Sequence, residues 1–177
     1  MNDVMIRKAA QGEYEKVRGF YHSMIDAMAA GPKVYVAWKK DVYPSPELIS
    51  GSIEKGEMYL ALEGDEITGA MVLNHDQGEG YAGIAWQTEA DDAEVMVIHA
   101  LGVHPKHAGK GYAKALVREA VGIAGRSGMK AIRLDVLRGN LPAERLYTGL
   151  GFRSIEKVQM YYEDTGLTEF SLYEYVL

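Results

Sequence analysis

The stretch "LGVHPKHAGKGYAKALVREA", residues 101–120, joins the end of an apolar run to a segment with helical spacing. Gly109 and Gly111 stand at the junction, where glycine lets the backbone turn sharply and approach a ligand without a Cβ in the way. Apolar residues then recur every three or four positions, which predicts a helix with one face on a sheet. The start of such a helix offers unpaired N–H groups and the positive end of a dipole, so this glycine corner is suited to phosphate.

Two familiar phosphate loops do not fit the glycine corner. A Walker A loop requires glycine at 104 and Ser or Thr at 111, where the chain has His104 and Gly111. The pattern G-x-G-x-x-G requires glycine at 114, where the chain has Lys114. Residues 104–118 nevertheless carry four basic side chains and no acidic one, which leaves 15 of the 19 basic residues against 25 acidic ones elsewhere. A cationic corner on an anionic protein favours an anionic ligand.

The composition is that of an ordinary globular protein. With 177 residues, 47% of them hydrophobic, we expect a single domain over residues 1–177. The net charge of −6 argues against nucleic acid as a partner. The absence of cysteine removes disulfides, thiolate metal sites and acyl-cysteine chemistry. The start "MNDVMIRKAAQGEY" lacks a signal-peptide core and "VMVIHALGV" is too short to span a bilayer, so we expect a cytoplasmic protein with no membrane partner.

The hydrophobic periodicity predicts an α/β fold with a mixed central sheet and helices on both faces. Before the glycine corner we expect a strand at 3–9, helices at 12–30 and 46–54, a hairpin at 57–75, a loop at 76–93 and a buried strand at 94–103. After it we expect a helix at 109–127, a strand at 130–137, a short helix at 141–150 and two last strands that meet at 164–166.

Two motifs in this order resemble the GNAT acyl-CoA N-acyltransferases. Residues 108–113, "AGKGYA", are similar to that family's Q/R-x-x-G-x-G/A loop, and residues 140–152, "NLPAERLYTGLGF", are similar to its N-x-x-A-x-x-x-Y-x-x-x-G-F segment. The resemblance is clear over residues 94–152 and implies the GNAT fold, with acetyl-CoA as co-substrate and no metal. Ala108 departs from the usual Gln or Arg, so one side-chain contact is expected to be lost there.

The resemblance also implies where the coenzyme lies. The main chain of the glycine corner would cradle the pyrophosphate, and the strand end "LGV" would pair with the pantetheine arm. The implied coenzyme-binding residues are Leu101, Gly102, Val103, Ala108, Gly109, Lys110, Gly111, Tyr112, Ala113, Lys114 and Asn140. Asn140 is equally suited to capping the helix that follows it, and the two roles are compatible.

Two residues are candidates for catalysis. Tyr147 occupies the family's tyrosine position, which implies a phenol that protonates the leaving thiolate; the alternative is a core residue of a short helix. His99 lies two residues before Leu101, where many members of the family carry a glutamate base. An imidazole can do that work near neutral pH, and the alternative is a histidine satisfied by a neighbour within an apolar strand. Backbone N–H groups near Leu101 and Gly102 are candidates for the oxyanion, since glycine in a strand often marks a bulge.

The acceptor site is less defined by the sequence. By analogy with the fold, Trp38 and Tyr43 are candidate substrate-binding residues, although aromatic residues in loops often only pack. The run "EADDAE" at 89–94 either attracts a cationic amine or is a solvated loop. The histidines at 99, 104 and 107 have no suitably spaced carboxylate, so we expect no metal.

The resemblance thus implies an N-acetyltransferase that moves an acetyl group to a primary amine of a small molecule, an amino acid or a peptide. Direct transfer in a ternary complex is expected. The alternative is a non-catalytic acyl-CoA-binding or sensing module on the same fold. The last strand, "LYEYVL", is by analogy a candidate homodimer interface.

Overall fold

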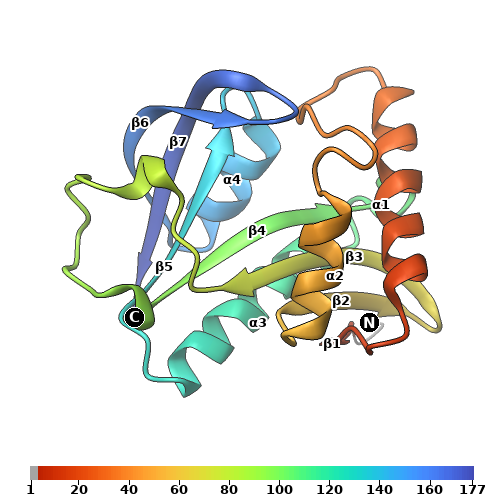
Figure 1. Ribbon diagram of the computed structural model, residues 1–177, viewed down its shortest axis with the longest axis horizontal. Helices are drawn as coiled ribbons and strands as arrows, with labels where there is room; N and C mark the ends of the chain where they lie inside the picture. The colour runs from red at the N-terminus through yellow and green to blue at the C-terminus, as the bar shows by residue number, and fades with distance from the viewer. Residues whose placement is uncertain (1–3) are drawn as a thin grey trace.

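A seven-stranded sheet in the order β1-β2-β3-β4-β5-β7-β6 forms the centre of the molecule (Figure 1). The structure is a computed structural model that describes residues 4–177, so the predicted start of the first strand at residue 3 lies outside the described residues. The strands are β1 (Met5–Lys8), β2 (Met58–Glu63), β3 (Glu66–Asn74), β4 (Val95–Val103), β5 (Ala131–Leu137), β6 (Arg153–Tyr162) and β7 (Gly166–Val176). All neighbouring pairs are antiparallel except β4–β5, so the predicted mixed sheet is confirmed.

Helices cover both faces of this sheet, as predicted (Figure 1). The helices are α1 (Tyr14–Ala29), α2 (Pro46–Glu54), α3 (Tyr112–Arg126) and α4 (Leu141–Gly149). The apolar sides of α3 and α4 pack into one core with β2–β5 and β7, whereas α1 and α2 pack into a second core with β2, β3 and β4. None of the helices in the described part of the chain combines the length and apolar character that a membrane span requires.

The sheet opens between its two parallel strands. β4 and β5 pair only through Val95–Val97 and Ala131–Arg133, and beyond these residues the strands diverge (Figure 1). β5 stays paired with β7 along its whole length, and β4 stays paired with β3. The later half of β4 therefore has an edge that β5 does not cover.

A bulge in β4 lies at the start of this opening. His99 opposes Val72 and Gly102 opposes Ala70, so two residues of β4 share a single partner on β3. Ala100 adopts φ of 50°, and its carbonyl accepts a 2.8 Å hydrogen bond from the phenol of Tyr21 on α1. The bulge that Gly102 predicts is thus confirmed, with its centre at Ala100.

The segment between β3 and β4 is mostly loop, as predicted, with two short 3₁₀ turns, η1 (Glu79–Tyr81) and η2 (Asp92–Glu94). A buried ion pair fixes it to the sheet: Arg133 Nε lies 2.9 Å from Glu174 Oε2, and the two residues are 3% and 0% exposed. Arg133 also donates to the carbonyl of Thr88, and Glu174 accepts the N–H of Gln87 at 2.7 Å. A buried ion pair thus attaches this loop to the sheet, whereas apolar packing attaches the helices.

Candidate active site

The glycine corner has the backbone geometry of an anion site. Gly109 and Gly111 have φ of 78° and 84°, in the left-handed region that favours glycine. Gly111 is the N-cap of α3, and no side chain caps that helix, whereas Ser45 caps α2 and Asn140 caps α4. A Cβ on either glycine would have no neighbour within 4 Å, so the space in front of the corner is open. Uncapped N–H groups facing open space fit the pyrophosphate of a coenzyme.

The charge at this corner is lower than the sequence count suggests. The β2–β3 hairpin brings Glu63 and Glu66 to it: Lys106 pairs with Glu66, and Lys110 Nζ lies 3.7 Å from Glu63 Oε2. The buried ring of His107 lies between the same two carboxylates, with 3.4 Å contacts to each.

Two basic side chains of the glycine corner remain available to bind an anion. Lys114 and Arg118 lie on α3 and form no ion pair within residues 4–177. An anion at the N-terminus of α3 would therefore meet these side chains without competition from a carboxylate. Of the three lysines near Ala108, Lys114 is the best placed to replace the side-chain contact that Ala108 lacks, because Lys106 and Lys110 pair with Glu66 and Glu63.

Replacing Gly111 with alanine should weaken coenzyme A binding about 5- to 30-fold. The left-handed conformation costs a residue with a Cβ about 1–2 kcal/mol, so the binding-competent corner is populated less often. Isothermal titration with coenzyme A measures the effect. Gly125→Ala is the matched control, because Gly125 lies within α3, without positive φ and with open space at its Cβ. Equal affinities for the two variants would contradict the role of the corner.

A cavity of about 100 Å³ lies where β4 and β5 diverge. Six residues singled out from the sequence line it, namely Trp38, Tyr43, His99, Leu101, Asn140 and Tyr147. Gly102 and Val103 continue β4 away from the cavity toward the glycine corner, which holds the remaining predicted residues, Ala108 to Lys114. The structure thus arranges the predicted coenzyme and catalytic residues along one strand edge, and their individual roles stay predictions.

The position of Tyr147 is compatible with both roles that the sequence left open, a core residue of a short helix and a phenol facing the coenzyme. It lies on α4, is 6% exposed and packs edge-on against Phe152, with 5.4 Å between ring centroids. It also lines the cavity. Burial raises the pKa of the Tyr147 phenol, and the charge of Asp135 raises it further, so the hydroxyl stays protonated at neutral pH.

His99 is partly satisfied but keeps a basic nitrogen. Its Nε2 lies 2.8 Å from Asn74 Oδ1, an oxygen that also accepts the N–H of Asp76 at 2.9 Å. An amide oxygen has no proton to give, so Nε2 donates and Nδ1 retains the lone pair. Burial lowers the pKa of His99, with partial opposition from Asp76, so the ring is neutral at physiological pH.

Two carboxylates in the cavity were missed by sequence reasoning. Asp135 on β5 accepts hydrogen bonds at Oδ2 from the phenols of Tyr81 at 2.6 Å and Tyr162 at 3.0 Å. Asp164, in the turn between β6 and β7, lines the same cavity. An aspartate inside the buried strand "AIRLDVL" was a signal that could have identified Asp135. Asp164 gave none, because aspartate is common in turns.

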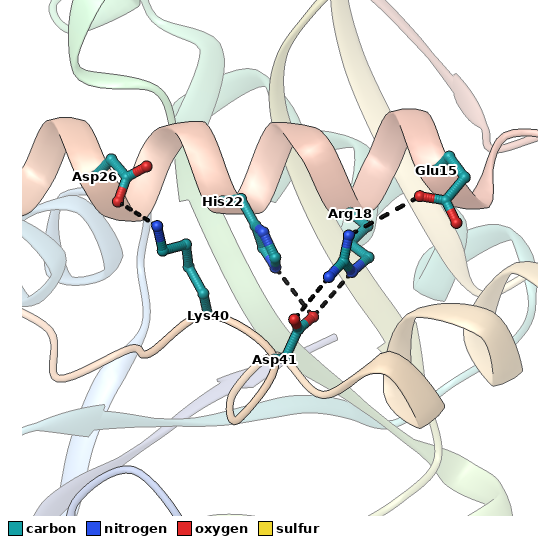
Figure 2. A network of polar contacts seen from close by, with 6 residues as sticks. All are labelled: Glu15, Arg18, His22, Asp26, Lys40 and Asp41. Carbon is teal, nitrogen blue, oxygen red and sulfur yellow. Dashed lines mark hydrogen bonds and ion pairs between the residues drawn. The ribbon is translucent and has the colours of Figure 1, made fainter.

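The aromatic wall of the cavity is held in place by α1. Ring contacts run from Trp38 to Tyr43 at 6.0 Å and from Tyr43 to Tyr162 at 5.4 Å. Asp41, which lies between Trp38 and Tyr43 in the sequence, accepts two hydrogen bonds from Arg18 on α1, at 2.9 and 2.7 Å (Figure 2).

Two further contacts strengthen this attachment. His22 Nε2 lies 3.0 Å from Asp41, and Lys40 Nζ lies 2.9 Å from Asp26 on α1 (Figure 2). The segment that carries Trp38 and Tyr43 has little regular secondary structure of its own, so these polar contacts position it.

The acidic run at 89–94 lies apart from this cavity. Glu89, Asp91 and Glu94 border a different, shallow surface depression beside Arg133. Glu94 pairs with Lys130 at 2.9 Å. The residues of the run therefore do not line the cavity and form part of the loop surface. Within residues 4–177, no group of three or more potential metal ligands is found.

The structure thus has a sheet split between two parallel strands, with the glycine corner and a tyrosine-lined cavity along the uncovered edge of β4. The sequence pattern of the Acetyltransferase (GNAT) family matches residues 25–152, and the chain belongs to that family. The chain is 32% identical over 93 residues to the N-alpha-acetyltransferase RimI of Mycobacterium tuberculosis. That match covers 52% of this chain and 56% of RimI, so the chain spans little more than half of this curated relative.

Solved structures share the fold at low sequence identity. The protein yncA from Salmonella typhimurium, solved with its cofactor acetyl-CoA, superposes with a TM-score of 0.68 at 17% identity, covering 99% of this chain and 95% of its own. NAA60 from Arabidopsis thaliana, solved with a bisubstrate analogue, superposes with a TM-score of 0.68 at 20% identity, with 98% of each chain covered. The predicted GNAT fold is therefore confirmed.

Proposed function

We propose that this protein is an N-acetyltransferase that moves the acetyl group of acetyl-CoA directly to a primary amine in a ternary complex. The observation that carries the proposal is the opening between β4 and β5, which places Tyr147 and His99 in one cavity beside an uncovered strand edge. Membership of the GNAT family and the bound acetyl-CoA of yncA support the choice of co-substrate.

The chain offers three kinds of contact to the coenzyme. The first-turn N–H groups of α3 and the side chain of Lys114 would hold the pyrophosphate. The β4 edge beyond Val97 would hydrogen-bond the pantetheine arm through the main chain. When bound, acetyl-CoA supplies a thioester carbonyl carbon that an amine can attack. N–H groups of Leu101 and Gly102, beside the bulge, would donate to the negative charge on the carbonyl oxygen.

The two candidate catalytic residues have complementary protonation states. His99, neutral at Nδ1, would accept the proton that the amine must lose as its nitrogen bonds to carbon. Tyr147, protonated because burial raises its pKa, would give its proton to the sulfur as the C–S bond breaks. No cysteine exists to carry the acetyl group, which favours direct transfer.

Replacing His99 with glutamine should lower kcat about 100-fold and remove the acid limb of the pH–rate profile. Because burial lowers the pKa of His99, the wild-type base persists below the usual value of about 6.5, and activity falls only as pH drops through that lowered pKa. The profile of kcat/KM from pH 5 to 9 measures this. Ser50→Ala, on the exposed side of α2, is the control. An acid limb that persists in the His99 variant would place the base elsewhere.

A screen of primary amines with acetyl-CoA, read as released thiol and acetylated product, tests the proposed function. We expect thiol release that depends on the amine and matches the product one to one. Coenzyme A binding without transfer to any amine would instead favour the alternative of a sensing module. Titration calorimetry on the same sample separates that outcome from a sample that has lost its coenzyme site.

A further inference from the structure

The charge of the cavity is one-sided. Its lining residues include the carboxylates of Asp135 and Asp164 but no lysine or arginine. The histidine among them, His99, is neutral at physiological pH because burial lowers its pKa. A cavity whose wall carries two aspartates and neither lysine nor arginine attracts cations and repels carboxylates.

Asp164 has an unused hydrogen-bonding atom inside the protein. The residue is 9% exposed, and its Oδ1 has no hydrogen-bond partner among the described residues. A buried carboxylate oxygen without a donor is costly, and a ligand that brings a charged N–H group relieves that cost. Burial raises the pKa of Asp164, and Lys39, which opposes that rise, is exposed and does not line the cavity.

Asp135 contributes the second carboxylate of the cavity wall. Burial raises the pKa of Asp135, while the phenols of Tyr81 and Tyr162, which donate to its Oδ2, oppose that rise by favouring the ionised carboxylate.

The two aspartates enter the cavity from different segments. Asp135 stands opposite Leu172 in the middle of β7, whereas Asp164 lies in the turn that precedes Gly166, where β7 begins. Beyond the larger effect of burial, the charge of Asp135 raises the pKa of Tyr147, Tyr43 and Tyr162, and that of Asp164 raises the pKa of Tyr43 and Tyr162. Asp135 therefore lies near the candidate acid Tyr147 as well as the aromatic wall.

We propose that the acceptor is a small aliphatic diamine without a carboxylate, with its reacting nitrogen at Asp135 and its second ammonium at Asp164. This inference rests on the proposed function and narrows it. The two carboxylates match the two ammonium groups of the free diamine. The reacting ammonium loses one proton to solvent before its nitrogen attacks, and His99 accepts the second proton as the nitrogen bonds to carbon. A free amino acid would instead bring its own carboxylate into an anionic cavity. The proposed acceptor thus carries two amino groups and no carboxylate.

Three five-carbon amines test the inference in the wild-type protein: 1,5-diaminopentane, n-pentylamine and lysine. We expect kcat/KM for the diamine to exceed that for the monoamine at least about 10-fold, since hydrogen bonds between charged groups are worth about one to two powers of ten in affinity. Lysine, which differs from the diamine by one carboxylate, should be used at least about 100-fold less well.

Asp164→Asn keeps the shape and the acceptor oxygen of the turn but removes the charge. It should raise KM for the diamine about 10-fold, raise KM for the monoamine much less, and alter kcat less than twofold for both. Glu163→Gln removes the same charge from the exposed neighbouring residue and should change nothing. Thermal unfolding of both variants shows whether the turn itself is intact.

The outcomes separate the two proposals. Transfer to all three amines with similar kcat/KM, or an Asp164→Asn variant that affects the monoamine as strongly as the diamine, overturns the diamine assignment and leaves the acetyltransferase standing. Coenzyme A binding with no transfer to any amine overturns the proposed function, and the diamine assignment with it.

Discussion

Replacing Tyr147 with phenylalanine will lower kcat at least about 100-fold and leave the dissociation constant of coenzyme A within about twofold. The substitution removes only the hydroxyl, so the ring still packs against Phe152 and fills the same volume. General acid catalysis contributes about two to four powers of ten, and this phenol is kept protonated by burial. Steady-state kinetics and titration calorimetry on the same preparation separate turnover from affinity.

Tyr161→Phe is the matched control for this experiment. Tyr161 lies on β6, 62% exposed, so loss of its hydroxyl should change neither kcat nor coenzyme affinity. If Tyr147→Phe retained full turnover, the phenol would be only a core residue of α4. A rise in the coenzyme dissociation constant with unchanged kcat would make Tyr147 a binding residue instead.

Replacing Glu174 with alanine will lower the free energy of unfolding by about 3–5 kcal/mol. Glu174 is fully buried, and its loss leaves the guanidinium of Arg133 charged and without its partner. The N–H of Gln87 loses its acceptor at the same time, which releases the loop between β3 and β4. Urea unfolding followed by circular dichroism measures the change.

A double variant separates the two contributions to this loss. Arg133→Met with Glu174→Leu fills the space with apolar side chains and removes both charges, so it should recover most of the lost stability. Glu156→Ala, an exposed glutamate on the neighbouring strand β6, should change the unfolding free energy by less than about 0.5 kcal/mol. A Glu174→Ala variant as stable as that control would show that the ion pair contributes nothing net.

The order of elements and the glycine corner could be predicted because they depend on local signals. Helical spacing after Gly111 and a glycine in β4 each encode a backbone feature within a few residues, and the structure has an uncapped α3 and a bulge there. The resemblance to the GNAT family adds the position of Tyr147 within α4. These features follow from short stretches of chain.

What the sequence did not reveal depends on contacts between distant segments. Glu63 and Glu66 reach the glycine corner from a hairpin some forty residues earlier, so a charge count over neighbouring residues overestimates its positive charge. Asp164 enters the cavity only because β6 and β7 pair beside β5, an arrangement of the sheet that local periodicity does not specify.

The buried ion pair between β5 and β7 also depends on contacts between distant segments. Arg133 and Glu174 are 41 residues apart, and they meet because β5 and β7 place them directly opposite each other. Alternation in "AIRLDVL" places Arg133 on the face opposite Ile132, Leu134 and Val136, so the sequence pattern alone does not predict a buried charge pair at this position. Pairing of strands decides which buried polar groups find partners.

The most direct measurement of the central claim is a single-turnover experiment with protein in excess over acetyl-CoA labelled in the acetyl group. In the presence of an amine that the screen identifies as an acceptor, we expect the label to pass to the amine in one phase, with an equal amount of free coenzyme A and no label on the protein. Label that appears on the protein before it appears on the amine would contradict direct transfer at the opening between β4 and β5.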